Sequence, residues 1–311
     1  MGPHLCRDRC PRRHGWWSET VATCRQLLPA ARARTPRAPD LEARDAPVTQ
    51  RAGVTDGRRR VRGWGSASRA TRATRTWGNG RAPTRVEPAV TADSTIPPAT
   101  VKVDIWSDIA CPWCFIGMRK FEEAVRRFDG TVEVEYHSFE LSPDTPVDFE
   151  GDEVDFLSKH KGMPAEQVRG MLGTVAGIAS EVGLAYDFDR LQHTNTVKAH
   201  ELLHFAKAGG RQIEMKERLL RAYFEEGRHV GRVDDLVVLA AEVGLDEQEA
   251  REALETGRHL DDVRADQAQA QAFGITGVPF FVLDGKYGIS GAQAPEAFVQ
   301  ALEQVAAEVA R

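Results

Sequence analysis

The sequence predicts an α/β fold in which a βαβ unit and a closing ββα unit flank a long helical insert. First, the run "VKVDIWS" at 101–107 alternates apolar and polar residues, as a strand with one buried face does. Second, from about 151 to 271 apolar residues recur three and four positions apart, as in helices. Third, the turn signal Asp284-Gly285 separates two short strand-like runs near the end.

A helix and a second strand complete the first unit. After the first strand, apolar residues recur at helical spacing until Asp129-Gly130 ends the pattern. The run "TVEVEYHSFEL" at 131–141 alternates again and predicts the second strand. The pair Cys111 and Cys114 thus lies where the first strand meets the helix. The apolar positions of that helix are Phe115, Met118, Phe121, Val125 and Phe128.

The same periodicities predict the helices of the insert and the elements of the closing unit. Helical patterns at 166–183, 196–210, 214–227 and 233–244 each have a glycine close behind the end, which helix C-termini prefer. The acidic run 247–255 is typical of a solvated helix face. In the closing unit we expect strands at Phe280–Leu283 and Lys286–Ile289, then a helix that turns Phe298, Leu302 and Val305 to one side.

The first hundred residues differ in composition from the rest. Residues 1–100 contain 19 Arg, no Lys and 8 acidic residues, a net charge of about +11, and show no apolar period. Such a segment cannot bury enough apolar surface to offset its ordering entropy, so we predict that it is disordered. A nucleic-acid-binding arm, a targeting peptide and a misassigned start are three candidate origins. We favour a misassigned start, with the real one between Val86 and Val101, because Arg without Lys suggests a bias towards GC-rich codons.

Charge and hydropathy restrict the function of residues 101–311. This part carries a net charge of about −16, which would repel the phosphates of a nucleic acid, so no nucleic-acid partner is expected. No stretch reaches the roughly 18 apolar residues that a membrane span needs, and no apolar signal region follows the N-terminal charges. The sequence therefore predicts a cytoplasmic protein that does not bind membranes.

The two cysteines at 111 and 114 are candidates for redox chemistry. Of five cysteines, Cys6, Cys10 and Cys24 fall in the segment expected to be disordered. A structural zinc site needs four ligands, and no second CxxC accompanies the pair, so we expect no metal. A cysteine at a helix N-terminus faces unsatisfied amides that stabilise its thiolate, and Cys111 is placed so. One turn later, Cys114 can attack a mixed disulfide formed at Cys111 and resolve it.

Two prolines and a tryptophan belong to the same candidate site. Pro112 suits a first helical turn because it needs no amide donor there. Pro279 directly precedes a short strand, where a cis bond would expose the backbone of Val278 to an extended thiol substrate. Trp113, between the cysteines, is expected to be exposed and to contact substrate, although packing over Cys111 fits the sequence equally well.

Several runs together resemble the DsbA-type family of thioredoxin-fold oxidoreductases, and most of all its FrnE-like branch. The runs are "VDIWSDIACPWCFIGMRKFEEAV", "SFELSPD", "NTVKAHELLHFA" and "GVPFFVLDGKYGISGAQ", and the similarity spans Val101 to about Val309. The resemblance implies a thioredoxin fold with an inserted α-helical domain at about 151–271. It also implies Cys111 as nucleophile, Cys114 as resolving thiol and Val278-Pro279 as a cis-proline loop.

The resemblance sets the expected function and its main alternative. We expect a protein disulfide oxidoreductase that acts on thiol or disulfide substrates, binds no cofactor tightly and has glutathione as a candidate redox partner. The alternative is a glutathione-dependent isomerase or transferase, of the chromene-carboxylate isomerase or kappa type, acting on a small aromatic or polyketide-like substrate. Those enzymes generally keep a serine at the first active position, so two cysteines favour redox turnover. A third alternative is a binding module with vestigial cysteines.

Other motifs point to weaker hypotheses. His200 to His204, "HELLH", matches a zinc-protease pattern, which three fixed positions also produce by chance. Asn195 and His200, with His193, are candidates for lining a cleft between insert and core and binding a polar substrate group, or else are surface or capping residues. Glu140 or Asp104 is a candidate buried carboxylate for proton transfer at Cys114, and alternation does not decide between them.

Overall fold

The structure is a computed structural model that describes residues 100–309. The disorder predicted for residues 1–100 therefore falls, apart from Thr100, outside the described residues, as does nearly all of the range in which we expect the start. The described elements are β1 (Thr100–Ser107), α1 (Pro112–Arg127), β2 (Thr131–Ser138), α2 (Glu153–Lys161), α3 (Ala165–Glu181), α4 (Val197–Ala208), α5 (Gln212–Phe224), α6 (Val233–Glu242), α7 (Glu247–Thr256), α8 (Leu260–Ala272), β3 (Phe280–Leu283), β4 (Tyr287–Ser290) and α9 (Pro295–Val309).

The four strands form one mixed sheet in the order β2-β1-β3-β4. β1 and β2 run parallel, with Thr100 opposite Thr131 and Ser107 opposite Ser138. β3 runs antiparallel to β1 and β4 antiparallel to β3, so the closing hairpin extends the sheet on the side away from β2. The order places the start of α1, which follows β1, beside the start of β3 at the same end of the sheet.

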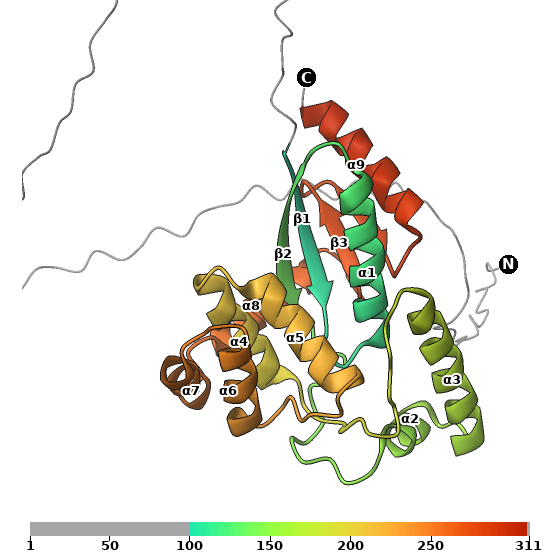
Figure 1. Ribbon diagram of the computed structural model, residues 1–311, viewed down its shortest axis with the longest axis vertical. Coiled ribbons are helices and arrows are strands. Elements are labelled where there is room, and N and C mark those ends of the chain that lie inside the picture. The colour runs from blue at the N-terminus through green and yellow to red at the C-terminus, as the bar shows by residue number, and fades with distance from the viewer. Residues whose placement is uncertain (1–99, 310–311) are drawn as a thin grey trace, which may run out of the picture. The chain divides into compact units, whose positions relative to one another are not determined.

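Helices α1 and α9 cover one face of the sheet (Figure 1). The alternation in β1 sends Val101, Val103 and Ile105 to this face, where each is at most 1% exposed. There they pack against Phe121 of α1 and Phe298 of α9. Burying these large apolar side chains supplies the main stabilisation of the layer.

The opposite face is covered in part by α8. Trp106 of β1 and Val282 of β3 point there and pack with Ala270 of α8 and with Ile275. The Trp106 indole N–H donates to the carbonyl oxygen of Asp266 at 3.1 Å, which satisfies the one polar group of this ring. The end of the insert is thereby held against the central strand.

The insert, α2 to α8, lies between β2 and β3 in the chain and has a hydrophobic core of its own. That core includes Phe115, Ile116 and Met118 from the first half of α1. The insert therefore packs against the part of α1 that carries the cysteines, and Figure 1 shows its helices gathered at the end of the sheet where β1 ends.

The predicted α/β fold with an inserted helical region is confirmed, with local differences. β2 ends at Ser138 rather than at 141, and the last strand is Tyr287–Ser290, one residue later than expected. α2 and α8 lie in the range predicted to be helical but were not predicted as separate helices. α2 begins with a capping box between Asp152 and Asp155 rather than with a strong apolar stripe.

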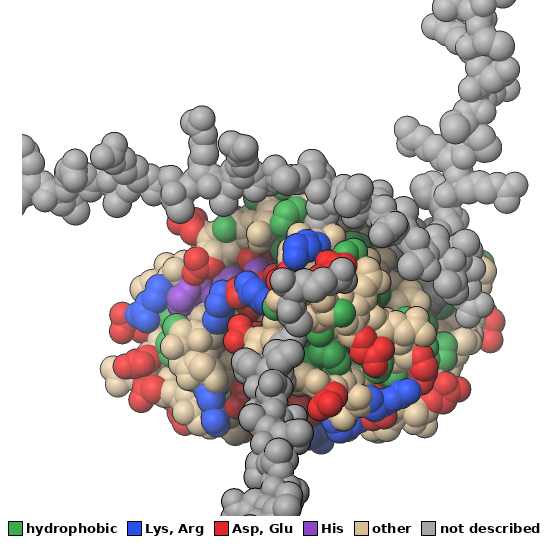
Figure 2. Space-filling model, turned by 90° about the horizontal axis from the view of Figure 1, so that it is seen from above, with side chains coloured by type: hydrophobic (Ala, Val, Ile, Leu, Met, Phe, Trp, Pro, Cys, Tyr) green, Lys and Arg blue, Asp and Glu red, His purple; other side chains and the backbone are tan. Residues whose placement is uncertain are grey.

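The surface of the described part is charged and mixed. Figure 2 shows Asp and Glu side chains interspersed with Lys and Arg on the face viewed from above. Between residues 100 and 309 no helix is long and apolar enough to cross a membrane.

Candidate active site

The two cysteines lie at the first turn of α1. Cys111 is the N-cap residue, with extended backbone angles of −96° and 111°, and Pro112 opens the helix. The Cys114 N–H donates to the carbonyl oxygen of Cys111 at 3.0 Å, which closes the first turn. Both cysteines are free, and they are only 4% and 3% exposed. Their sulfur atoms thus share a small, nearly water-free space.

The loop before β3 lies directly against Cys111. The Val278-Pro279 peptide bond is cis, as the resemblance to the DsbA-type family implies. The Cys111 thiol donates to the carbonyl oxygen of Val278 at 3.5 Å. On α1, a Cβ atom at Gly117 would come within 3.0 Å of the Pro279 ring, so glycine permits this close approach of helix and loop.

A buried carboxylate, Asp108, supports the loop between β1 and α1. It is 1% exposed, and its Oδ1 accepts from the Ile109 N–H at 2.7 Å while its Oδ2 accepts from the Leu141 N–H at 2.8 Å. The Nε2 atom of His200 lies 3.2 Å from Oδ1. Burial raises the pKa of Asp108, but the bond to His200 and the Leu141 N–H outweigh burial, so its pKa is lowered and it stays ionised.

The two thiols shift each other's pKa in opposite directions. The hydrogen bond with Cys114, together with burial, raises the pKa of Cys111 well above its ordinary value. Burial also raises the pKa of Cys114, but the hydrogen bond from Cys111, the charge of Lys216 and the Ser107 hydroxyl outweigh burial and lower it. The contact between the two sulfur atoms therefore moves their pKa values in opposite directions.

The expectation that the helix N-terminus stabilises the Cys111 thiolate stays a prediction. The Cys111 side chain makes no capping hydrogen bond to the amides of α1. Its thiol is instead directed to Val278 and Cys114.

Comparison with known proteins agrees with this geometry. A family model described as a DSBA-like thioredoxin domain matches residues 102–303. The chain belongs to the DSBA-like thioredoxin domain family. This match covers both cysteines and the Val278-Pro279 loop, and the resemblance to the DsbA-type family is thereby confirmed. The FrnE-like branch stays a prediction.

Individual relatives of this DSBA-like chain support the assignment. The crystal structure of a probable DsbA oxidoreductase from Streptomyces coelicolor is 42% identical, with a TM-score of 0.64, and the match covers 67% of this chain and 91% of that one. The uncharacterized protein YwbO of Bacillus subtilis (strain 168) is 35% identical over 209 residues, 65% of this chain and 96% of that protein. A 2-hydroxychromene-2-carboxylate isomerase, 12% identical with a TM-score of 0.51 over 67% of this chain and 97% of the other, shares the fold.

Two aromatic residues complete the surroundings of the cysteines in this DSBA-like domain. The Tyr186 hydroxyl, from the insert, donates to the carbonyl oxygen of Pro112 at 2.7 Å, and burial raises the pKa of this phenol. Trp113 is half-buried and packs against the core of the insert, so the expectation of an exposed indole is wrong. The physical reason is that the insert covers the first turn of α1, which the local pattern around Trp113 does not reveal.

Asn195 and His200 lie buried inside the protein rather than on the surface of a cleft. His200 is 0% exposed and pairs with Asp108. Asn195 is 8% exposed, donates to the Pro143 carbonyl oxygen at 2.9 Å and accepts from the Val197 N–H at 2.9 Å. His193, 5% exposed, pairs with a glutamate of α2. All three side chains are thus buried and paired within the protein rather than at its surface, and their contact with a substrate stays a prediction.

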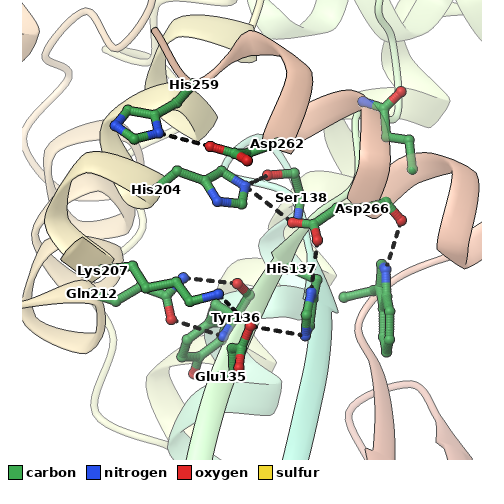
Figure 3. Close-up of polar contacts among 12 residues, drawn as sticks. Glu135, Tyr136, His137, Ser138, His204, Lys207, Gln212, His259, Asp262 and Asp266 are labelled. Atoms are coloured by element: carbon green, nitrogen blue, oxygen red, sulfur yellow. Dashed lines mark hydrogen bonds and ion pairs between the residues drawn. The ribbon is translucent and has the colours of Figure 1, made fainter. Parts of the chain in front are cut away.

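The two histidines of the "HELLH" run face different partners. His200 points to Asp108, whereas His204 Nε2 lies 3.1 Å from both Ser138 Oγ and Asp266 Oδ2 (Figure 3). In the described part of the chain they do not gather with a third metal ligand. The zinc-protease hypothesis is therefore not supported.

Three other side chains, Asp104, Glu135 and His137, have the spacing of a metal site within residues 100–309. Their carboxylates are already paired with lysines: Lys102 lies 3.1 Å from Asp104, and Lys207 lies 2.5 Å from Glu135. Positive charges at these distances oppose the binding of a cation. We therefore treat the group as an ion-pair network.

The expected buried carboxylate at Cys114 is neither Glu140 nor Asp104. Glu140 pairs with Arg264 and accepts from Gln267 at 2.6 Å, and Asp104 pairs with His137 at 3.0 Å. Asp104 lies on the sheet face away from α1 and Glu140 pairs with side chains of α8, whereas Asp108 lies in the loop next to the cysteines. The sequence signal for Asp108 was its place within "SDIACPWC", while Lys216 gave no signal because its partners are about a hundred residues away in the chain.

Proposed function

We propose that this DSBA-like protein is a thiol–disulfide oxidoreductase that works through Cys111 and Cys114. The observation that carries the proposal is the pair of hydrogen-bonded free thiols at the start of α1, with Cys111 directed to the carbonyl oxygen of Val278. Two thiols that share one proton supply both a nucleophile and a proton, as thiol–disulfide exchange requires.

The reductive half-reaction follows from this proton sharing. Cys111 passes its proton to Cys114 through their hydrogen bond and attacks one sulfur of a substrate disulfide. The substrate S–S bond breaks, a mixed disulfide forms at Cys111, and the substrate's leaving sulfur takes up a proton. The proton that this leaving sulfur takes up comes from Cys114, whose thiolate then attacks the Cys111 sulfur. The bond between Cys111 and the substrate breaks, the second substrate sulfur leaves as a thiolate that takes a proton from solvent, and a Cys111–Cys114 disulfide remains. Two electrons pass to the substrate, and the same steps in reverse oxidise a dithiol.

The loop before β3 is the expected docking place for the substrate. Gly277 and Val278 are half-buried rather than fully covered, and the Val278 carbonyl oxygen lies beside the Cys111 sulfur. An extended thiol substrate pairing with this backbone would bring its sulfur next to Cys111. A cysteine-containing polypeptide and glutathione are the two substrate classes that such a docking mode fits.

A glutathione-dependent isomerase remains the second candidate, because the fold is shared with 2-hydroxychromene-2-carboxylate isomerase. That chemistry needs one group to activate the glutathione thiol and no resolving cysteine. The two hydrogen-bonded cysteines of this chain favour the redox function over it.

Insulin reduction in glutathione buffer tests the proposal. We expect the wild-type protein to accelerate the reduction, Cys111→Ser to abolish the acceleration, and Cys114→Ser to accumulate a mixed disulfide with glutathione that mass spectrometry detects. Lys207→Met, which changes a lysine on α4 away from the cysteines, should keep full activity and serves as the control. Full activity of Cys111→Ser would refute the redox function, and glutathione-dependent isomerisation in that variant would favour the second candidate.

A further inference from the structure

His200, the first histidine of the "HELLH" run, is a buried polar side chain that the redox steps above leave unexplained. It lies in the first turn of α4 and is 0% exposed. Its Nε2 atom lies 3.2 Å from Oδ1 of Asp108. An ionised carboxylate can only accept, so Nε2 carries the proton and donates to Asp108. Since Nδ1 has no hydrogen-bond partner within residues 100–309, this donation is the one polar contact of the imidazole there.

The Asp108 carboxylate joins three separate segments of the chain. Its Oδ1 atom accepts from the N–H groups of Ile109 at 2.7 Å and Ala110 at 3.4 Å, which shapes the loop between β1 and α1. Its Oδ2 atom accepts from the Leu141 N–H at 2.8 Å, in the loop that follows β2. The donation from His200 brings in α4 of the insert. Because the carboxylate is 1% exposed, water does not readily replace a donor that is lost.

The loop that Asp108 shapes sets the position of the first cysteine. Ala110 is bonded directly to Cys111, so the carboxylate holds the chain one residue before the thiol. The Cys111 sulfur lies 3.5 Å from the Val278 carbonyl oxygen, beside the place where we expect a substrate sulfur. A buried carboxylate that loses a donor is destabilised and relaxes towards other donors, which moves the loop. Misplacing a reacting atom by about 1 Å can lower a rate by about a hundredfold.

We propose that His200 is a positioning residue of the redox site, which holds the Asp108 carboxylate and thereby keeps Cys111 beside the Val278 carbonyl oxygen. The inference rests on the proposed function and gives the insert a part in it, because α4 supplies the histidine. The role needs no contact between His200 and the substrate. It acts on the rate at which the Cys111 sulfur attacks a disulfide.

The second histidine of the same run provides a matched control. His204 lies one turn later on α4, and its side chain is 9% exposed. Its Nε2 atom lies 3.1 Å from Ser138 Oγ and from Asp266 Oδ2, so it contacts the sheet and α8 rather than the loop before Cys111. Replacing either histidine removes a largely buried hydrogen bond from α4, but only the replacement of His200 should slow thiol–disulfide exchange.

The first test measures how fast glutathione disulfide oxidises the reduced protein, followed by Trp fluorescence. Cys111 attacks one sulfur of glutathione disulfide, Cys114 then displaces the second glutathione, and the two electrons and the two thiol protons of the pair leave with two molecules of glutathione. We expect the second-order rate constant to fall about tenfold or more in His200→Leu. It should stay within about twofold in His200→Gln, whose amide nitrogen overlaps Nε2 of histidine and can still donate. His204→Leu should keep the wild-type rate.

Two results of this test would overturn the inference. One is a wild-type rate in a folded His200→Leu protein, and the other is an equal loss of rate in His200→Leu and His204→Leu. A wild-type protein that glutathione disulfide does not oxidise would instead overturn the proposed function, so the two failures are distinguishable.

A second set of variants keeps the inference falsifiable if His200→Leu does not fold. The amide nitrogen of His200→Asn overlaps Nδ1 rather than Nε2 and falls short of Asp108, and Asp108→Asn removes the charge that strengthens the bond. Each variant should lower the rate constant about tenfold, and the double variant should lower it no further, because His200 acts through Asp108. Losses that multiply in the double variant, or a wild-type rate in either single variant, would contradict the positioning role.

Discussion

His137 should make the stability of the protein strongly dependent on pH above neutrality. The imidazole, on β2, is 9% exposed and has its Nε2 atom 3.0 Å from Asp104. Its Nδ1 atom lies 2.8 Å from Asp266 (Figure 3). Burial lowers the pKa of His137, but the bonds to Asp104 and Asp266 outweigh burial and raise it to about 9. The perturbation that tests this is His137→Gln, which keeps an amide of similar reach and removes the titration.

The magnitude follows from the two pKa values. The folded pKa of about 9 exceeds the ordinary value of 6.5, so the folded state binds the proton more tightly. The resulting stabilisation is fully present below pH 6.5 and is lost as the pH rises through 9. At about 1.36 kcal/mol for each pKa unit, the loss is on the order of 3 kcal/mol.

Urea unfolding followed by Trp fluorescence, at a series of pH values from 6 to 10, measures this loss. The cysteines ionise in the same range, so the decisive quantity is the wild-type stability minus that of His137→Gln at each pH. We expect this difference to fall by roughly 3 kcal/mol across the series. A difference that stays constant with pH would refute the assignment of a protonated His137 between the two carboxylates.

Two packing predictions follow from single contacts. Gly231→Ala should lower the free energy of unfolding by about 1–3 kcal/mol, because a Cβ atom there would lie 2.2 Å from Thr194 Oγ1. Gly177→Ala should instead stabilise α3 by about 0.5–1 kcal/mol, because a Cβ atom there meets nothing within 4 Å. Phe298→Ala should lower the free energy of unfolding by about 3–5 kcal/mol, because the ring is 0% exposed in the core beside the sheet. Val309 is 47% exposed, so Val309→Ala should change the free energy of unfolding by less than about 0.5 kcal/mol. Urea unfolding checks both pairs, and equal losses within a pair would contradict the packing described.

Local patterns in the sequence were enough to predict the elements that frame the site. Burial imposes a period directly on the strand at 101–107 and on the helix after Cys114, and both periods can be read in the sequence. The turn between the last two strands is marked by Asp284-Gly285. The cis bond at Val278-Pro279 followed from the family resemblance combined with the place of the proline before a strand.

The polar support of the site could not be predicted in the same way. Lys216 and Tyr186 reach the cysteines only because the insert folds over the start of α1, and no local pattern records that contact. For the same reason His200, on a helix whose periodicity was recognised, could not be distinguished from a surface ligand until its partner Asp108 was known. Contacts between side chains that are far apart in the sequence could therefore not be predicted from local patterns.

The reduction potential of the Cys111–Cys114 pair tests the central claim most directly. The protein is equilibrated in glutathione buffers of known potential, and the fraction of disulfide is measured by Trp fluorescence and by mass after alkylation. We predict a reversible two-electron transition that disappears in both Cys111→Ser and Cys114→Ser, at a value between the roughly −270 mV of thioredoxin and the roughly −120 mV of DsbA. Thiols that stay reduced in every buffer, or a transition that survives in Cys111→Ser, would contradict the assignment of a redox function to this pair.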